Sequence, residues 1–222
     1  MSIAHMNGGA HRMDPPPLPV LAIARSYVAA GLSVLPIRAD GTKAPEWGLL
    51  PREFDPAEGR ERPVWKPYQS RLPTEAELHA WFASGRYGIA VVCGAVSGNL
   101  EVLDFESVEL FERWQDNLLR CRSPLLGRLP VVATPRPGRH VYYRLPFPPQ
   151  SSRKIARRRP TPEELTGRPG LKAVVLIETK GEAGYVLAPG SPPGCHASGG
   201  LYRHLGGPSL LDVPLIAGSL AS

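Results

Sequence analysis

The chain contains little cysteine and no long hydrophobic run. Its 222 residues include three cysteines, Cys93, Cys121 and Cys195, which stand far apart in the sequence. This spacing excludes a Cys-x-x-Cys zinc knuckle and argues against a disulfide framework. An odd number of unpaired cysteines predicts a reduced, cytoplasmic protein. No apolar segment approaches the roughly 20 residues that a membrane-spanning helix needs.

Lysine is also scarce. Only five of the 26 basic residues are lysines, and the formal net charge is +6. A net positive charge favours a polyanionic partner, and the planar guanidinium of arginine suits phosphate groups. The alternative is the codon bias of a GC-rich genome, since alanine, proline and glycine are abundant as well. We assign the larger part of the arginine excess to that bias.

The sequence lacks both common nucleotide-binding fingerprints. It has no G-x-G-x-x-G segment and no Walker A segment, so dinucleotide and P-loop chemistry lose their usual markers. Helical patterns alternate with strands at first, but the later strands follow one another through short turns. That order predicts an α+β fold with a mixed or antiparallel sheet. The predicted helices cover 18–30, 74–82 and 107–118, and the predicted strands cover 32–37, 88–93, 100–106, 131–134, 139–144, 172–179, 185–188 and 202–205.

The sequence divides into three parts. We predict a disordered leader or tag remnant over 1–17, a folded body over 18–205, and a linker or tail over 206–222. The segment 42–72 is rich in proline and predicted to be irregular. It carries Trp47, Trp65 and Tyr68, which either stack on bases or pack this segment against the sheet, and we favour packing slightly.

Two acids at the end of an apolar run are the most informative feature. Asp104 and Glu106 follow Leu100, Val102 and Leu103 and are separated by one residue. Side chains alternate along a strand, so both carboxylates would point to the same face. Such a pair can share two Mg²⁺ or Mn²⁺ ions. The ordinary alternative is a strand end that reaches solvent.

Other polar residues on predicted strands extend this pattern. His140 lies between Arg139 and Arg144, and Glu178 ends another apolar strand. Each residue alone has an ordinary structural explanation. Together, three carboxylates with a histidine flanked by arginines form the inventory of two-metal phosphoryl transfer.

The ordered set resembles the catalytic domain of bifunctional primase/polymerases, the prim-pol group of the archaeo-eukaryotic primase superfamily. The resemblance covers 18–205 and is carried by several motifs in order. They are Gly31-Leu-Ser-Val-Leu-Pro36, Lys43-Ala-Pro45, Pro73-Thr74 through Trp81-Phe82, Gly88-Ile-Ala-Val-Val-Cys-Gly94, Ser97-Gly98, Leu103-Asp-Phe-Glu106, Gly138-Arg-His140-Val-Tyr-Tyr-Arg144, Ile177-Glu178 and Gly184-Tyr-Val-Leu-Ala-Pro189-Gly-Ser191. Two positions depart from the pattern. Gly138 stands where a small hydroxyl residue is common, and Glu178 stands where aspartate is frequent.

The resemblance implies nucleotidyl transfer from an NTP or dNTP to a 3′-hydroxyl on a single-stranded DNA template, including de novo primer synthesis. It implies an RRM-like catalytic module beside an N-terminal αβ module. Two Mg²⁺ or Mn²⁺ ions would be held by Asp104, Glu106 and Glu178, while His140 would contact the triphosphate. The family often adds a helicase or an accessory domain, and its prokaryotic context can be plasmid or phage replication.

Further binding residues follow from charge and position. Arg139 and Arg144, together with Lys43 and Tyr185, are candidates for nucleotide binding. The basic run of Arg153, Lys154, Arg157, Arg158 and Arg159 is the candidate for binding the template backbone. Its alternative is a solvated loop.

Two other functions remain open from the sequence. A metal-dependent nuclease also uses clustered acids and a basic surface. A catalytically inactive module that binds single-stranded nucleic acid is the second alternative, although the presence of all three acids and His140 argues against it.

Overall fold

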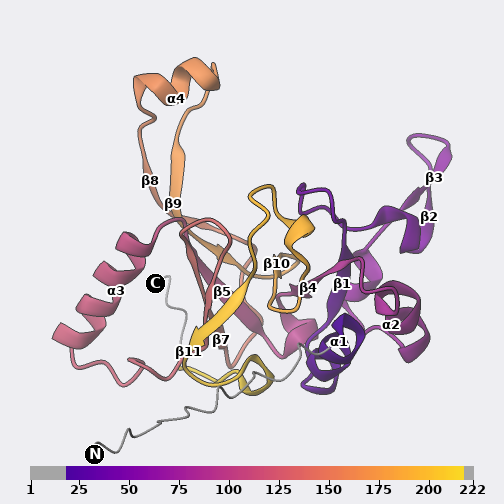
Figure 1. Cartoon of the computed structure of the whole chain (residues 1–222), viewed down its shortest axis with the longest axis horizontal. Coiled ribbons are helices and arrows are strands. Elements are labelled where there is room, and N and C mark those ends of the chain that lie inside the picture. The colour runs from indigo at the N-terminus through magenta and orange to yellow at the C-terminus, as the bar shows by residue number, and fades with distance from the viewer. Residues whose placement is uncertain (1–18, 218–222) are drawn as a thin grey trace, which may run out of the picture.

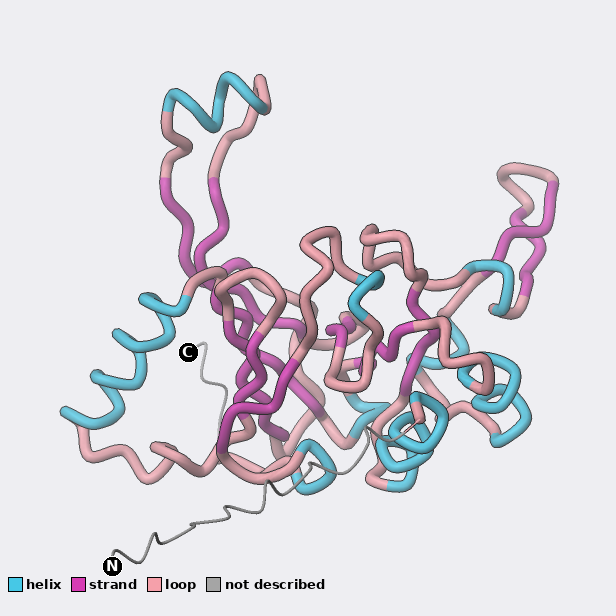
Figure 2. Tube along the Cα trace, in the orientation of Figure 1, coloured by secondary structure: helices cyan, strands magenta, loops and turns pink. Residues whose placement is uncertain are grey.

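The computed structural model describes residues 19–217, so the predicted leader lies outside the described residues. It confirms the mixed α+β class with antiparallel sheets. Figure 1 shows the arrangement, and Figure 2 separates helices, strands and loops. The helices are α1 (Val20–Ala29), α2 (Glu75–Phe82), α3 (Val108–Arg120) and α4 (Pro162–Gly167). The strands are β1 (Val34–Ile37), β2 (Arg52–Asp55), β3 (Arg60–Pro63), β4 (Gly88–Val92), β5 (Leu100–Phe105), β6 (Val131–Ala133), β7 (Arg139–Arg144), β8 (Lys154–Arg158), β9 (Val174–Lys180), β10 (Tyr185–Leu187) and β11 (Arg203–Gly206).

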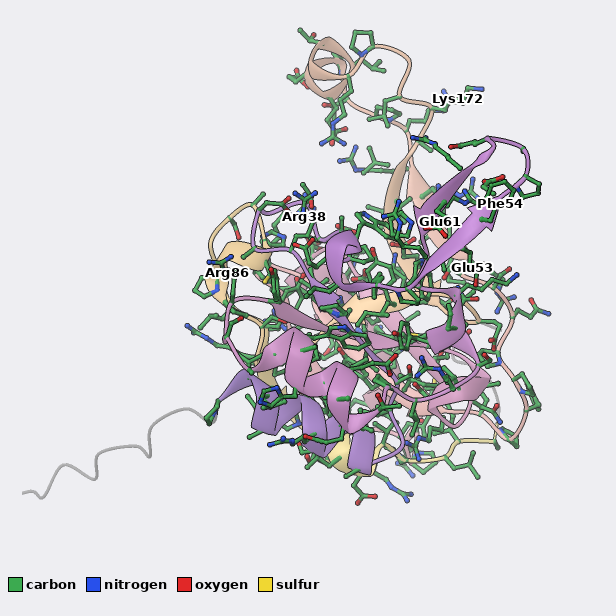
Figure 3. All side chains as sticks on the ribbon, turned by 90° about the vertical axis from the view of Figure 1, so that its right-hand side faces the viewer. Arg38, Glu53, Phe54, Glu61, Arg86 and Lys172 are labelled. Carbon is green, nitrogen blue, oxygen red and sulfur yellow. The ribbon has the colours of Figure 1, made fainter. Side chains whose placement is uncertain are left out.

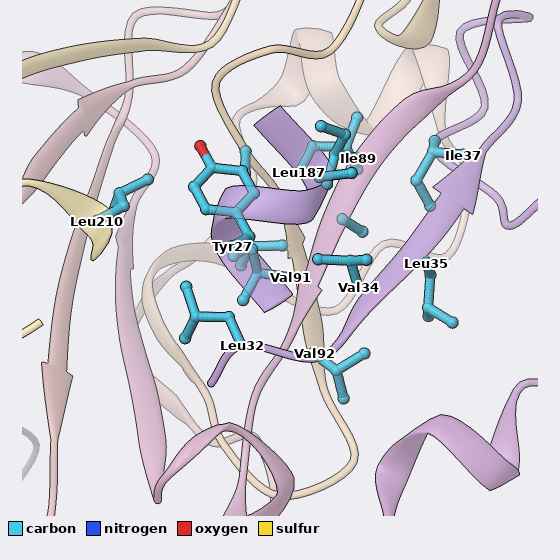
Figure 4. Packing of buried hydrophobic residues seen from close by; sticks show 14 of the residues in the cluster. Tyr27, Leu32, Val34, Leu35, Ile37, Ile89, Val91, Val92, Leu187 and Leu210 are labelled. Carbon is cyan, nitrogen blue, oxygen red and sulfur yellow. The ribbon is translucent and has the colours of Figure 1, made fainter. Parts of the chain in front are cut away.

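A three-stranded sheet of order β1-β4-β10 forms the N-terminal half of the core. Every residue of β1 and β4 is buried, which explains why these strands are continuous apolar runs without alternation. Figure 4 shows Val91 of this sheet next to Tyr27 of α1, and Leu35 on the opposite side of β1. Helix α2 begins at a capping box, as Thr74 and Glu77 predict.

A six-stranded sheet of order β11-β6-β7-β5-β9-β8 forms the other half. Its central strand β5 pairs with β7 on one side and with β9 on the other, antiparallel in both cases. Leu103 and Phe105 of β5 pack in the cluster under α3, with Phe111. The even-numbered residues Leu100 and Val102 belong to the core shared with the three-stranded sheet. Asp104 therefore points to the side away from α3.

Two hairpin arms project from the body, one from its left half and one from its right-hand end in Figure 1. One joins β2 to β3, inside the segment predicted to be irregular. The other joins β8 to β9 and carries α4 at its tip, where the sequence predicts no helix. The exposed residues of β2, β3 and β8 are largely charged. Strands that bury no face have no apolar alternation, so periodicity does not reveal them.

The predicted linker or tail over 206–222 differs from the structure in its described part, up to residue 217. Leu210, Val213 and Ile216 are buried, and Leu215 forms a bridge with Arg144 of β7. These apolar residues recur every three positions and pack on the body, which a solvated linker would not do. Among the described residues, no helix has the length and apolar character needed to span a membrane.

Candidate active site

Three carboxylates meet at the centre of the six-stranded sheet. Asp104 lies on β5 opposite Glu178 of β9, and Glu106 follows directly after β5. One oxygen from each of Asp104, Glu106 and Glu178 lies within 4.8 Å of the others. The register between β5 and β9 is thus what joins acids that are more than 70 residues apart in the chain.

The site disfavours the ionised forms of Asp104 and Glu106. Burial, and then the charge of Glu178, raises the pKa of Asp104 to about 6, although Lys180 opposes this shift. Burial and the nearby Asp104 raise the pKa of Glu106 as well. Carboxylates held together in a partly buried place repel one another, and a cation between them relieves that repulsion.

His140 completes the cluster from β7, opposite Asp104 in the register. The ring is buried, and its Nε2 lies 3.5 Å from Oδ1 of Asp104. The hydroxyl of Tyr142 lies 3.4 Å from the other ring nitrogen. Burial lowers the pKa of His140 to about 3, with Lys180 and Lys43 acting in the same direction. The imidazole is therefore neutral at pH 7 and offers one donor and one acceptor.

These side chains line a cavity of about 370 Å³. Its other lining residues are Lys43, Ser152, Lys180, Ala183, Gly184, Tyr185, Val186, Leu187 and Tyr202. A second cavity of about 490 Å³ shares Lys43 and is lined by Gly41, Thr42, Arg136, His196, Ala197 and Ser198. An acidic cavity thus adjoins a cationic one. Tyr202 lies between them, with its ring centre 5.9 Å from that of His140 and 6.4 Å from that of His196.

Lys43 is held at the boundary by an unusual backbone conformation. Its φ of 62° is left-handed, which is uncommon outside glycine. The hydroxyl of Tyr185 donates a hydrogen bond of 3.2 Å to the carbonyl of Lys43. Burial lowers the pKa of Lys43, and Arg136 adds to the effect. Backbone strain of this kind is typical of ligand sites.

The model of the bifunctional DNA primase/polymerase N-terminal domain matches residues 24–216. The chain belongs to the Prim-Pol family. No curated protein matches it. Membership confirms the resemblance read from the ordered motifs and indicates a primase/polymerase of the nucleotidyltransferase type, with DNA and nucleotides as substrates. Prim-Pol enzymes depend on metal ions, and the three-carboxylate set fits a hard divalent cation, which prefers oxygen ligands.

The structure does not bring every predicted binding residue of this Prim-Pol domain to the cavity. Arg139 pairs with Phe105 in the register, so it lies on the opposite face from His140. Arg144 stands at the far end of β7 and donates a hydrogen bond of 3.0 Å to the carbonyl of Ala30. Both arginines flank His140 in sequence, but strand geometry directs them elsewhere.

The basic run lies on the β8–β9 arm rather than in a loop. Arg153 is half-buried at its base, whereas Lys154, Arg157 and Arg159 are exposed. Arg158 makes an ion pair with Glu164 of α4 at 2.7 Å. Of the predicted stacking residues, Tyr68 is buried and Trp65 packs edge-on against Tyr185, so these two pack the segment, whereas Trp47 is exposed.

Sequence reasoning missed Lys180, Arg136, Ser152 and Tyr202. Lys180 stands two positions after Glu178, and alternation along the strand is a signal that would have found it. Arg136 lies in the turn just before the histidine motif, and its charge beside Gly138 was a weaker signal. Tyr202 and Ser152 reach the cavity only through tertiary packing, for which the sequence has no local marker.

The surroundings of Gly138 explain why glycine stands here in place of the small hydroxyl residue of the family pattern. A Cβ built at this position would lie 2.5 Å from the carbonyl oxygen of Phe105 and 2.8 Å from Oγ1 of Thr134. Neither contact is tolerated by real Cβ atoms. A hydroxyl residue therefore does not fit here without movement of the backbone, and a side-chain contact to phosphate from this position is absent.

Proposed function

We propose that this domain is a metal-dependent primase and polymerase that transfers a nucleotidyl group from an NTP or dNTP to a 3′-hydroxyl on a single-stranded DNA template, with release of pyrophosphate, and that also makes primers de novo. The observation that carries the proposal is the meeting of Asp104, Glu106 and Glu178 in one cavity with a neutral His140. The adjoining cationic cavity with Lys43 and Arg136 supports it further.

Asp104, Glu106 and Glu178 are proposed to hold two Mg²⁺ or Mn²⁺ ions. Such ions, when bound, neutralise charge on the triphosphate and acidify the attacking hydroxyl. The raised pKa of Asp104 supports this role, because the cluster is least favourable when it is ionised without a cation. Glu178 has the reach of one extra methylene compared with aspartate.

The triphosphate of the incoming nucleotide is proposed to extend from the acidic cavity into the cationic one. His140 donates a hydrogen bond from a neutral ring and adds no charge that would compete with the ions. Lys43 and Arg136 supply positive charge for the phosphate oxygens. Tyr185 keeps Lys43 in place through its carbonyl. We assign the six-stranded sheet to the RRM-like catalytic module and the three-stranded sheet with α1 and α2 to the N-terminal αβ module.

The template is proposed to follow the exposed cations of the β8–β9 arm. This arm, residues 153–172, has seven basic and two acidic side chains. The β2–β3 arm, residues 52–62, has three basic and four acidic side chains, with ion pairs from Arg52 to Glu61, Arg60 to Glu58 and Arg62 to Asp55. Figure 3 labels Phe54 and Glu61 on this arm and Lys172 on the other.

The activity is tested with a bare single-stranded template, labelled triphosphates and Mg²⁺ or Mn²⁺. The wild type is expected to lengthen or initiate strands, and Asp104→Asn/Glu106→Gln should reduce incorporation by at least about 10³-fold, the scale of losing electrostatic stabilisation in a reaction site. Glu109→Gln/Glu112→Gln, on the exposed face of α3, removes the same charge as a control and should leave the rate unchanged. Shortened strands would favour a nuclease, and incorporation by the double variant would refute the proposal.

The arm is tested by replacing Lys154, Arg157 and Arg159 with glutamine. Affinity for single-stranded DNA should fall by about 30-fold at low salt, and the slope of log affinity against log salt should shrink by about 2, because three phosphate contacts are lost. The matched control replaces Arg52, Arg60 and Arg62 with glutamine. Equal losses in the two variants would show that the β8–β9 arm has no special role.

A further inference from the structure

Lys180 contacts the acidic cluster in a way that the proposed chemistry does not use. It follows Glu178 by two positions on β9, so both side chains leave the same face of the strand. Its ammonium forms an ion pair with Oε1 of Glu178, and both side chains are about three-quarters buried or more, with exposed fractions of 25% and 18%. Lys180 also lines the acidic cavity.

Lys180 is the cation that offsets the cluster. In the described part of the chain, two of the ion-pair contacts involve the cluster, Lys180 with Glu178 and His140 with Asp104. His140 is neutral, so the full positive charge in contact with these acids comes from Lys180. Its influence also extends to Asp104, where it opposes the rise in pKa that burial causes.

The ion pair between Lys180 and Glu178 can form and break reversibly. Its compact ammonium on a flexible four-carbon stem can leave one carboxylate without disturbing the backbone. A divalent cation held by Glu178 binds the same carboxylate group with which Lys180 pairs through Oε1. The ammonium and the ion therefore compete for Glu178.

We propose that Lys180 is a positioning residue that acts as a built-in counter-ion, holding Glu178 in the cluster of the metal-free enzyme and leaving it when a divalent ion binds. This inference rests on the proposed metal-binding function of the cluster. Lys180 stabilises the empty site and lowers its affinity for metal. Once displaced, its ammonium remains in the cavity, where it faces the region proposed for the triphosphate.

The test is a titration with Mn²⁺ alone, followed by the electron paramagnetic resonance signal of free Mn²⁺, without nucleotide or DNA. Lys180→Met removes the charge at similar length and should bind Mn²⁺ about 10-fold more tightly than the wild type. Lys43→Met, which removes a cation from the same cavity with no ion pair to the cluster in the described residues, should change the affinity by less than about threefold. Competition by direct contact is stronger than a screened charge at a distance.

A second variant keeps the charge. Lys180→Arg should weaken Mn²⁺ binding several-fold, because a guanidinium can hold both oxygens of a carboxylate. In EDTA, Lys180→Met should also melt about 2–4 °C below the wild type, since the acids lose their counter-ion. Unchanged or weaker Mn²⁺ binding by Lys180→Met, or tighter binding by Lys180→Arg, would overturn this inference alone. Absence of Mn²⁺ binding by the wild type would overturn the proposed metal site itself.

Discussion

Two carboxylate sites in this domain have opposite energetics. Glu77, in the first turn of α2, accepts hydrogen bonds from both terminal nitrogens of Arg71 at 2.7 and 2.8 Å, from the hydroxyl of Tyr68 at 2.8 Å and from the amide of Thr74 at 2.7 Å. Asp104, at the end of β5, faces other acids and a neutral histidine. The pKa of Glu77 is lowered to about 2, chiefly by Arg71, whereas burial raises that of Asp104 to about 6.

Ionised Glu77 therefore stabilises the folded state, whereas ionised Asp104 destabilises it. Glu77 connects α2 to the segment before it, and every oxygen has donors. Asp104 is held ionised among like charges at a stability cost, which is typical of residues kept for function. Removing the negative charge should therefore lower the stability of the protein at Glu77 and raise it at Asp104.

The largest expected effect on stability is at Glu77. Glu77→Gln should lower the free energy of unfolding at pH 7 by about 2 kcal/mol and the melting temperature by about 4–8 °C, because charge-assisted hydrogen bonds are lost. Glu75→Gln, on the same helix in an exposed pair with Arg25, is the control and should shift the melting temperature by less than about 2 °C. Both are measured by thermal unfolding.

The pH dependence of the same site follows from the direction of its shift. The folded pKa of Glu77 is below its unfolded value of 4.5, so its contribution is present above pH 4.5 and is lost as the pH falls towards 2. Acid unfolding of Glu77→Gln should therefore be shallower in this window. An unchanged acid limb would contradict the stabilising role of Glu77.

The next effect has the opposite sign. Asp104→Asn should raise the free energy of unfolding at pH 7 by about 1–2 kcal/mol in EDTA, because an acid with a raised pKa destabilises the fold when it ionises. The folded protein binds the proton more tightly than the unfolded chain between pH 3.8 and about 6. Wild-type stability should therefore fall as the pH rises through that window, and the variant should lack this fall. Urea unfolding at several pH values measures both, and a less stable Asp104→Asn would break the comparison.

Much of the site is predictable because strand ends are visible in the sequence. Asp104, Glu106, His140 and Glu178 each lie on or next to an apolar strand, and the ordered motifs are enough to locate them. The register that places Asp104 opposite both His140 and Glu178 is a tertiary property. The sequence contains the residues of each strand but not the order of the strands in the sheet.

The differences between the sequence-based predictions and the structure also have physical causes. Arg139 and Arg144 are close to His140 in sequence, but one lies on the other face of β7 and the other at its far end. The sequence does not reveal the arms because β2, β3 and β8 bury no apolar face. It does not reveal the packed tail because the burial of Leu210, Val213 and Ile216 depends on packing against distant parts of the chain. Pattern reasoning finds residues that are buried at regular intervals, and it fails where exposure or long-range packing decides.

We propose that Asp104 and Glu106, whose ionised forms are destabilised at the end of β5, serve to bind divalent metal ions. The most direct measurement is the unfolding free energy of wild type and Asp104→Asn at pH 7, with and without about 1 mM Mn²⁺. Binding to the folded state alone stabilises it by RT ln(1 + [Mn²⁺]/Kd), so a Kd of about 50 µM would stabilise the wild type by about 2 kcal/mol. We expect this gain for the wild type and little or none for Asp104→Asn, so that Mn²⁺ reverses or abolishes the stability advantage of the variant. Equal stabilisation of both proteins, or none of either, would contradict it.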